Sequence, residues 1–211
     1  MKNQRIKQYL LSPTCLKCGS FFCNDSLFCN VCFQIEIGPR IYTGSLSHLA
    51  EFQHYYLLEW NKNESNVLSQ MVYRLKSDNS LPAWSYYSKL LIKKININFN
   101  EYAGFVPIPG SKQSSIHSLI LARELSNISG LPVFDILSRK KTAIEQKRRS
   151  AVERENEDTI SLKKQQSVHF TKCIFVDDIL TTGQSFLQSN RAVNGLKENI
   201  IITLFYRSRI R

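Results

Sequence analysis

The fold of this chain is decided by the stretch Cys173-Ile-Phe-Val-Asp-Asp-Ile-Leu-Thr-Thr-Gly-Gln-Ser185. Its apolar residues 174–176 indicate a central parallel strand that is buried on both faces. The hydroxyl-rich turn at residues 181–185 leads into a helix predicted over residues 184–196, where apolar side chains recur at helical spacing. Because the first N–H groups of a helix lack partners and its dipole is positive there, this turn is suited to bind a phosphate.

The acidic residues of this stretch, Asp177 and Asp178, lie between the apolar strand and the turn. A carboxylate repels a phosphate, so the pair is expected to contact a neutral or a cationic group instead. The vicinal hydroxyls of a ribose and a Mg²⁺ ion both meet this requirement. Each part alone is more often an ordinary helix cap or turn, but all parts in register predict a ribose-phosphate site.

The order of strand, acidic pair, two apolar residues and Thr-Thr-Gly-Gln-Ser resembles the fingerprint of the type I phosphoribosyltransferases. The resemblance implies that Asp177 and Asp178 hold the 2′ and 3′ hydroxyls of phosphoribosyl pyrophosphate (PRPP), directly or through Mg²⁺. It further implies that the 5′-phosphate of PRPP is cradled by the loop residues Thr181, Thr182, Gly183, Gln184 and Ser185.

A second motif near the start of the chain consists of two Cys-x-x-Cys pairs separated by ten residues. Four thiolates at this spacing can close a tetrahedron around one Zn²⁺, and such sites stabilise a small module without catalysing a reaction. The predicted ligands are Cys15, Cys18, Cys29 and Cys32, with Cys23 as an alternative. A disulfide is disfavoured, because no secretory signal is predicted before the motif and a cytoplasmic protein keeps its thiols reduced.

A zinc module joined to a phosphoribosyltransferase-like domain resembles the ComF family, bacterial proteins associated with natural competence and the uptake of transforming DNA. Residues 73–76 are similar to that family's helix ending in a lysine, 106–109 to its Val-Pro-x-Pro strand exit, and 137–154 to its Arg…Thr…Gln…Arg segment. After the strand exit the family has Arg-Gly-Phe-Asn-Gln, whereas this chain has Gly-Ser-Lys-Gln-Ser. Without that arginine, Lys112 is the basic residue expected near the pyrophosphate. The missing arginine favours ligand binding over catalysis.

The predicted fold class is α/β, with residues 1–37 as the zinc module and residues 38–211 as a phosphoribosyltransferase-like domain; a single domain is the alternative. A parallel sheet flanked by helices is expected, with ligands at the carboxyl ends of its strands. Strands are predicted at residues 55–60, 103–107, 132–137, 173–177 and 200–206. Helices are predicted at residues 64–76, 84–95, 114–129 and 184–196, and a polar flap at 138–164. The chain has no apolar run of the ~20 residues that a membrane helix requires, so a soluble, cytoplasmic protein is expected.

The formal net charge of +11 is high for 211 residues, and much of it is local. Residues 139–154 contain seven basic residues against two acidic ones. Such a cluster attracts polyanions and favours single-stranded DNA as a partner, with a flap that only closes over pyrophosphate as the alternative. The predicted nucleic-acid-binding residues are Arg139, Lys140, Lys141, Lys147, Arg148, Arg149 and Arg154. A C-terminal strip adds Arg207, Arg209 and Arg211.

The resemblance therefore predicts a ComF-type protein that binds PRPP and handles single-stranded DNA, in contact with the DNA-uptake machinery at the inner membrane. The alternative is an active phosphoribosyltransferase that acts on an unidentified nitrogen nucleophile, for which no catalytic residue is assigned. Five residues follow Tyr206, which leaves little chain for a base-recognition segment and favours the binding protein. The four histidines are scattered and are expected to be surface or satisfied core groups, and Cys173 is expected to be a core residue.

Overall fold

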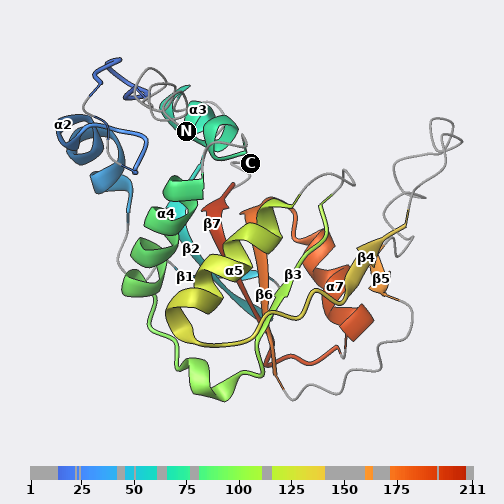
Figure 1. Ribbon diagram of the computed structural model, residues 1–211. Helices are drawn as coiled ribbons and strands as arrows, with labels where there is room; N and C mark the ends of the chain where they lie inside the picture. The colour runs from blue at the N-terminus through green and yellow to red at the C-terminus, as the bar shows by residue number, and fades with distance from the viewer. Residues whose placement is uncertain are drawn as a thin grey trace, which may run out of the picture.

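Figure 1 shows the computed structural model of the protein. It describes residues 14–21, 23, 25–41, 46–49, 51–60, 66–76, 81–110, 116–140, 160–163, 172–193 and 195–207. Within these residues the chain forms a five-stranded sheet, a separate two-stranded sheet and helices that cover the larger sheet. In this described part of the chain, no helix has both the length and the apolar character needed to cross a membrane.

The large sheet is mostly parallel. It consists of β1 (Leu46–Leu49), β2 (Phe52–Glu59), β3 (Phe105–Pro107), β6 (Ile174–Leu180) and β7 (Ile200–Tyr206). The strand order is β1-β2-β7-β6-β3; β1 pairs antiparallel with β2, and every other pair is parallel. The predicted α/β class is confirmed, and the carboxyl ends of β2, β7, β6 and β3 lie at one edge.

Helices cover both faces of this sheet (Figure 1). They are α4 (Leu81–Lys94), α5 (His117–Ser129) and α7 (Gln184–Val193), whereas α3 (Asn66–Leu75) packs against α4. Successive residues of a strand point to opposite faces. Accordingly, Ile174 and Val176 of β6 belong to a core with α3, α4 and α5, whereas Phe175 belongs to a second core with α7. These helices begin and end close to the predicted bounds.

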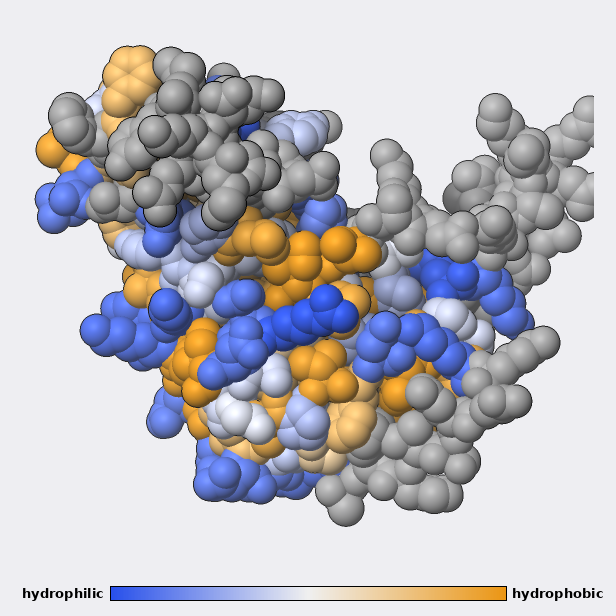
Figure 2. Space-filling view, viewed as in Figure 1, coloured by the Kyte–Doolittle hydropathy of each residue, from blue (hydrophilic) through white to orange (hydrophobic). Residues whose placement is uncertain are grey.

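The helix α4 is amphipathic, as its sequence period predicts. Trp84 and Tyr87 are buried against the sheet, whereas Lys89 and Lys93 are exposed. Figure 2 shows the face that α4 and α5 cover, where blue hydrophilic side chains lie among orange hydrophobic ones. The outer surface of these helices is thus a mixed, solvent-facing surface, whereas ligand sites in such α/β sheets lie at the carboxyl edge of the strands.

The two-stranded sheet consists of β4 (Leu137–Arg139) and β5 (Ile160–Leu162), which pair antiparallel. These strands form the two ends of the predicted polar flap. Residues 141–159 of that flap lie outside the described residues. The two ends of the flap are therefore hydrogen-bonded to each other as the antiparallel pair β4 and β5.

The strand predicted at residues 132–137 is wrong in its bounds. Val133 makes an isolated parallel bridge with Phe105, and Ile136 N–H donates to Phe134 O (2.9 Å). This tight turn redirects the backbone, so that β4 begins only at Leu137. The antiparallel strand β1 was also absent from the prediction, because its short Leu-Ser-His-Leu sequence carries little strand signal.

The cysteine-bearing region packs against α4. It contains α2 (Asn30–Cys32), the π-helix η1 (Phe33–Ile37) and the 3₁₀ helix η2 (Gly38–Arg40). Phe28 and Ile37 are fully buried and belong to the same core as α4. Tyr87 Oη of α4 donates to Ser26 O (2.6 Å). The region thus shares a core with the sheet, and a domain boundary at residue 37 stays a prediction.

Candidate functional site

The turn between β6 and α7 depends on Gly183. Its φ of +77° lies in the left-handed region, which glycine adopts at little cost. A Cβ atom at this position would overlap the side chain of Leu49 on β1. The loop backbone therefore lies directly against the edge strand, and a residue with a side chain does not fit there.

This loop lines a small hollow, open to solvent, at the carboxyl end of β6. Leu187 N–H donates to Gly183 O (2.9 Å) and Gln184 N–H donates to Thr182 Oγ1 (3.4 Å), so the N–H groups of Ser185 and Phe186 are the ones without an acceptor within α7. Together with the threonine hydroxyls and the positive end of the helix dipole, these groups suit an anion. The predicted ligand residues that line the hollow are Asp177, Thr181, Thr182, Gly183, Gln184 and Ser185.

The acidic pair lies within β6 itself. Asp178 N–H donates to Asp177 Oδ1 (2.8 Å), and both residues are half-buried. Burial and the negative charge of Asp178 raise the pKa of Asp177 well above its usual range. Asp177 thus holds a proton more readily than an ordinary aspartate, and it can serve a hydroxyl ligand as donor or acceptor.

Asp178 forms an ion pair with Lys76, the residue that follows α3. Lys76 Nζ lies 2.7 Å from Asp178 Oδ2, and the exposed fractions of the two side chains are 37% and 13%. The sequence indicated a helix that ends in a lysine, but it did not indicate this partner. The Asp178 carboxylate is therefore already neutralised by a cation of the protein.

His117, at the start of α5, lies beside this ion pair. Its ring is nearly parallel to that of Trp84, at 8° and with 6.2 Å between centroids. Burial lowers the pKa of His117, although the negative charge of Asp178 opposes this effect. Among the described residues its buried Nδ1 has no hydrogen-bond partner. His117 is thus a neutral imidazole that does not fit the prediction of a surface or satisfied core histidine.

His54 on β2 confirms the prediction of a satisfied core histidine. It is fully buried, and its Nε2 lies 2.8 Å from Thr203 Oγ1 and its Nδ1 lies 2.8 Å from Ser47 Oγ. Because the Thr203 hydroxyl donates to Phe205 O (2.9 Å), it must accept from His54 Nε2–H. Ser47 Oγ–H then donates to Nδ1. Burial lowers the pKa of His54 to about 3, so this chain of bonds across β1, β2 and β7 contains a neutral histidine.

Arg139 reaches the loop from β4. Its Nη2 donates to Ser185 Oγ (2.9 Å), and its Nε donates to Pro109 O (3.2 Å) at the exit of β3. Burial lowers the pKa of Arg139, and the nearby Asp177 carboxylate opposes that shift. The sequence placed Arg139 in the nucleic-acid cluster, whereas the structure brings its guanidinium to the loop after β6.

The remaining basic residues of the prediction are placed only in part. Lys140 is exposed, and the Arg207 guanidinium lies over the ring of Trp60, 5.5 Å from its centroid. The residues that lie outside the described part of the chain are Lys112, Lys141, Lys147, Arg148, Arg149, Arg154, Arg209 and Arg211. Their assignment to pyrophosphate or to nucleic acid stays a prediction.

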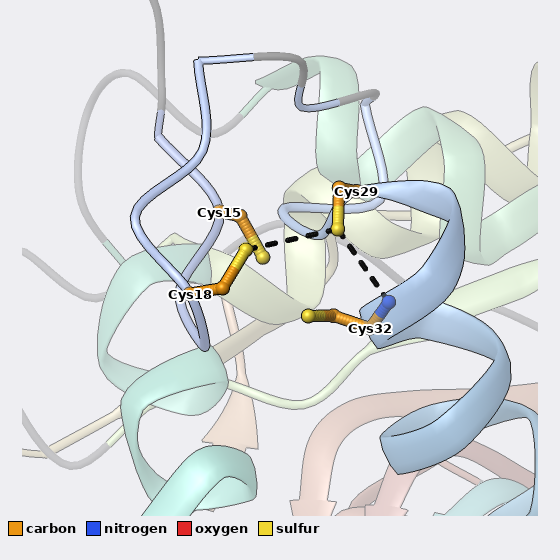
Figure 3. A group of neighbouring side chains, drawn as sticks. All are labelled: Cys15, Cys18, Cys29 and Cys32. Carbon is orange, nitrogen blue, oxygen red and sulfur yellow. Dashed lines mark hydrogen bonds between the residues drawn. The ribbon is translucent and has the colours of Figure 1, made fainter.

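Four cysteines converge in the N-terminal region. Figure 3 shows the side chains of Cys15, Cys18, Cys29 and Cys32 gathered from a loop and from the start of α2. Their sulfur atoms all lie within 4.8 Å of one another, and Cys18 Sγ is 3.8 Å from Cys29 Sγ. A tetrahedron with metal–sulfur bonds of 2.3 Å has edges of about 3.8 Å, so the cluster fits a tetrahedral metal site.

The backbone supports this arrangement at both Cys-x-x-Cys pairs. Gly19 N–H donates to Cys15 O (2.9 Å), with Gly19 at a φ of +73°, and Cys32 N–H points to Cys29 Sγ (3.5 Å). Although burial opposes ionisation, backbone hydrogen bonds lower the pKa of Cys15 to about 6. One thiol of the cluster is thus a thiolate at neutral pH, which is the form that binds a metal.

The two other cysteines lie apart from this cluster. Cys23, the alternative ligand, is not among the four converging thiols, and burial raises its pKa to about 11. Cys173 is fully buried, and burial raises its pKa to about 12. The core position predicted for Cys173 is confirmed.

No protein-family model matches the chain, and a search of curated proteins found no matching relative. The function therefore rests on the chemistry of the two sites, because a fold by itself does not determine an activity.

Proposed function

We propose that the protein is a ComF-type competence protein that binds PRPP and handles single-stranded DNA during DNA uptake. One observation supports the ligand: Asp177 of the acidic pair and the Gly183 loop line the same hollow, at the carboxyl edge of a mostly parallel sheet. A sugar phosphate has hydroxyls that can bind the acidic residue and a phosphate anion that can bind the loop. This edge is also where open α/β sheets bind their ligands.

In this proposal, each end of the ligand meets groups of matching chemistry. Asp177 and Asp178 accept hydrogen bonds from the ribose hydroxyls, and the loop from Thr181 to Ser185 binds the 5′-phosphate with its amides and hydroxyls. Mg²⁺ would be held by these carboxylates together with the ligand and would neutralise the diphosphate. Lys76 already supplies one positive charge at Asp178.

Single-stranded DNA is the proposed macromolecular partner. The net charge of +11 favours the binding of a polyanion. Lys140, which is exposed, is the first residue of the basic segment that follows β4. Contacts from lysine and arginine to phosphates would hold a strand without reading its sequence. The proposal places the protein in the cytoplasm, next to the uptake machinery at the inner membrane.

For the four-cysteine cluster we propose a structural Zn²⁺. Zinc prefers four thiolates in a tetrahedron, and the 3.8 Å separation of Cys18 Sγ and Cys29 Sγ suits this geometry. All four positions would be filled by protein sulfur, so the ion would have no open position for a substrate. Its role would be to hold the two Cys-x-x-Cys loops together beside α4.

An active phosphoribosyltransferase is the second candidate, and His117 is the observation that favours it. A neutral imidazole with a buried nitrogen that lacks a partner among the described residues can accept a proton from a nitrogen nucleophile. The departure from the Arg-Gly-Phe-Asn-Gln stretch after the strand exit still favours binding over catalysis. Measuring pyrophosphate release with a panel of nitrogen nucleophiles decides between the two.

The ligand proposal is tested by calorimetry with PRPP and Mg²⁺. The Asp177→Asn/Asp178→Asn variant should lose binding, because amide oxygens neither accept hydrogen bonds from the ribose hydroxyls as strongly nor bind Mg²⁺ as tightly as carboxylates do. Glu51→Gln/Glu101→Gln is the matched control: it removes the same charge from two residues whose side chains are each 51% exposed in surface ion pairs. Equal affinity of the acidic-pair variant and this control would refute the site.

A further inference from the structure

Arg139 lies where three parts of the proposed site meet. Its Nε is bonded to Pro109 O at the carboxyl end of β3, and its Nη2 to Ser185 Oγ at the start of α7. The charge of Asp177, at the carboxyl end of β6, also acts on it. The guanidinium is therefore half-buried at the sheet edge, on the side of the loop rather than on the open surface.

The loop needs a positive side chain if it is to bind a phosphate. Residues 181–185 contain hydroxyls, an amide and a glycine but no cationic side chain. Asp177 lines the same hollow and repels an anion when it is ionised. Helix-start amides alone carry only about half a positive charge, whereas a phosphate monoester carries nearly two negative charges. A full positive charge at the loop would correct this imbalance.

Arg139 is held in a suitable orientation for this task. The bond from Nε to Pro109 O fixes one edge of the guanidinium plane, and Nη2 already donates to an oxygen at the loop. A guanidinium donates two parallel hydrogen bonds to a phosphate and stays protonated even when partly buried. The Nη2 donor of Arg139 is thus already directed at the loop, beside the position where it would contact a phosphate oxygen.

We infer that Arg139 is a binding residue of the 5′-phosphate subsite, where its guanidinium and the Ser185 hydroxyl contact the phosphate of a phosphorylated ribose together. This inference rests on the proposed sugar-phosphate site and deepens it. It assigns Arg139 a different ligand from the basic residues that follow it in sequence, which keep their proposed role in binding nucleic acid.

The experiment compares three probes by calorimetry: ribose 5-phosphate, PRPP and inorganic pyrophosphate. Arg139→Gln should weaken the binding of ribose 5-phosphate and of PRPP alike, by about ten- to a hundredfold, because each loses a charge-assisted contact to the same phosphate. Arg139→Lys should recover part of this loss, since the charge remains but the second donor does not. Lys93→Gln is the control and should leave both affinities unchanged, because Lys93 is an exposed residue of the same charge on the outer surface of α4.

A weakening confined to PRPP and pyrophosphate would place Arg139 at the diphosphate end and overturn the inference, as would unchanged affinity in Arg139→Gln. If wild-type protein binds neither sugar phosphate, the proposed ligand itself fails, a result distinct from both. Should Arg139→Gln not fold, Ser185→Ala and Arg139→Lys carry the test. Their losses in ribose 5-phosphate affinity should combine to less than the product of the two single effects, because both residues act on one phosphate. Independent effects would contradict a shared contact.

Discussion

Acidification should destabilise this protein through His54, which is buried as a neutral imidazole. The test lowers the pH from 7 to 5 and compares the resulting change in unfolding free energy between wild-type protein and the His54→Gln variant. Glutamine keeps a polar group at this position but does not titrate. The variant is expected to be less stable at pH 7, since its bonds to Ser47 and Thr203 are altered, but its stability should depend less on pH.

The magnitude follows from the two pKa values of His54. In the unfolded chain a histidine titrates near 6.5, whereas burial lowers the folded pKa to about 3. Between these values the unfolded state binds a proton that the folded state excludes, so stability is present above pH 6.5 and is lost as the pH falls toward 3. Between pH 7 and pH 5 this linkage amounts to about 2 kcal/mol.

Denaturant unfolding at the two pH values gives the free energies directly. Wild type should lose about 2 kcal/mol more than His54→Gln over this interval. The contributions of all other groups are common to the two proteins and cancel in the comparison. An equal loss in the two proteins would show that His54 accepts its proton in the folded state and would falsify its assignment as a buried neutral bridge across β1, β2 and β7.

Other changes act on the two sites. Cys29→Ser should reduce bound metal from one ion per chain toward none by elemental analysis, because one thiolate of the tetrahedron is removed; full metal content in the variant would contradict the ligand set. Gly183→Ala should cost about 1–3 kcal/mol in unfolding free energy, through its positive φ and its overlap with Leu49; a neutral effect would refute the close contact. Replacing Lys147, Arg148 and Arg149 by alanine should shallow the salt dependence of single-stranded DNA binding by roughly 2 log units per log unit of salt. Wild type that binds no such DNA at ~0.1 M salt would exclude that partner.

The parts of the structure that the sequence predicted well are those written in contiguous residues. The apolar run 174–176, the acidic pair and the glycine turn lie in one stretch, so their order alone indicated a strand, a site and a helix. The cysteine cluster was predictable for a similar reason, because each Cys-x-x-Cys pair fixes two ligands within one turn.

The contacts that complete the site could not be predicted in this way. Lys76 and Asp178 come from different elements, and Arg139 and Ser185 are 46 residues apart. Hydrophobic period and turn chemistry carry no information on which charged side chains will meet at a sheet edge. Arg139 was grouped with the basic residues beside it in sequence, whereas backbone pairing of β4 with β5 sets its actual position.

The burial of Phe28 and Ile37 in the main core would make the supply of metal to the proposed cysteine site a determinant of the stability of the whole fold. An ion that binds the folded cysteine cluster and not the unfolded chain adds about 1.4 kcal/mol of stability for each tenfold rise in its free concentration above the dissociation constant. Since Tyr87 of α4 is bonded to the backbone between the two cysteine pairs, this gain extends to the helix that covers the sheet. A chelator should therefore lower the melting temperature of the part of the chain that contains the five-stranded sheet, and metal starvation should deplete the protein through proteolysis before any ligand is bound.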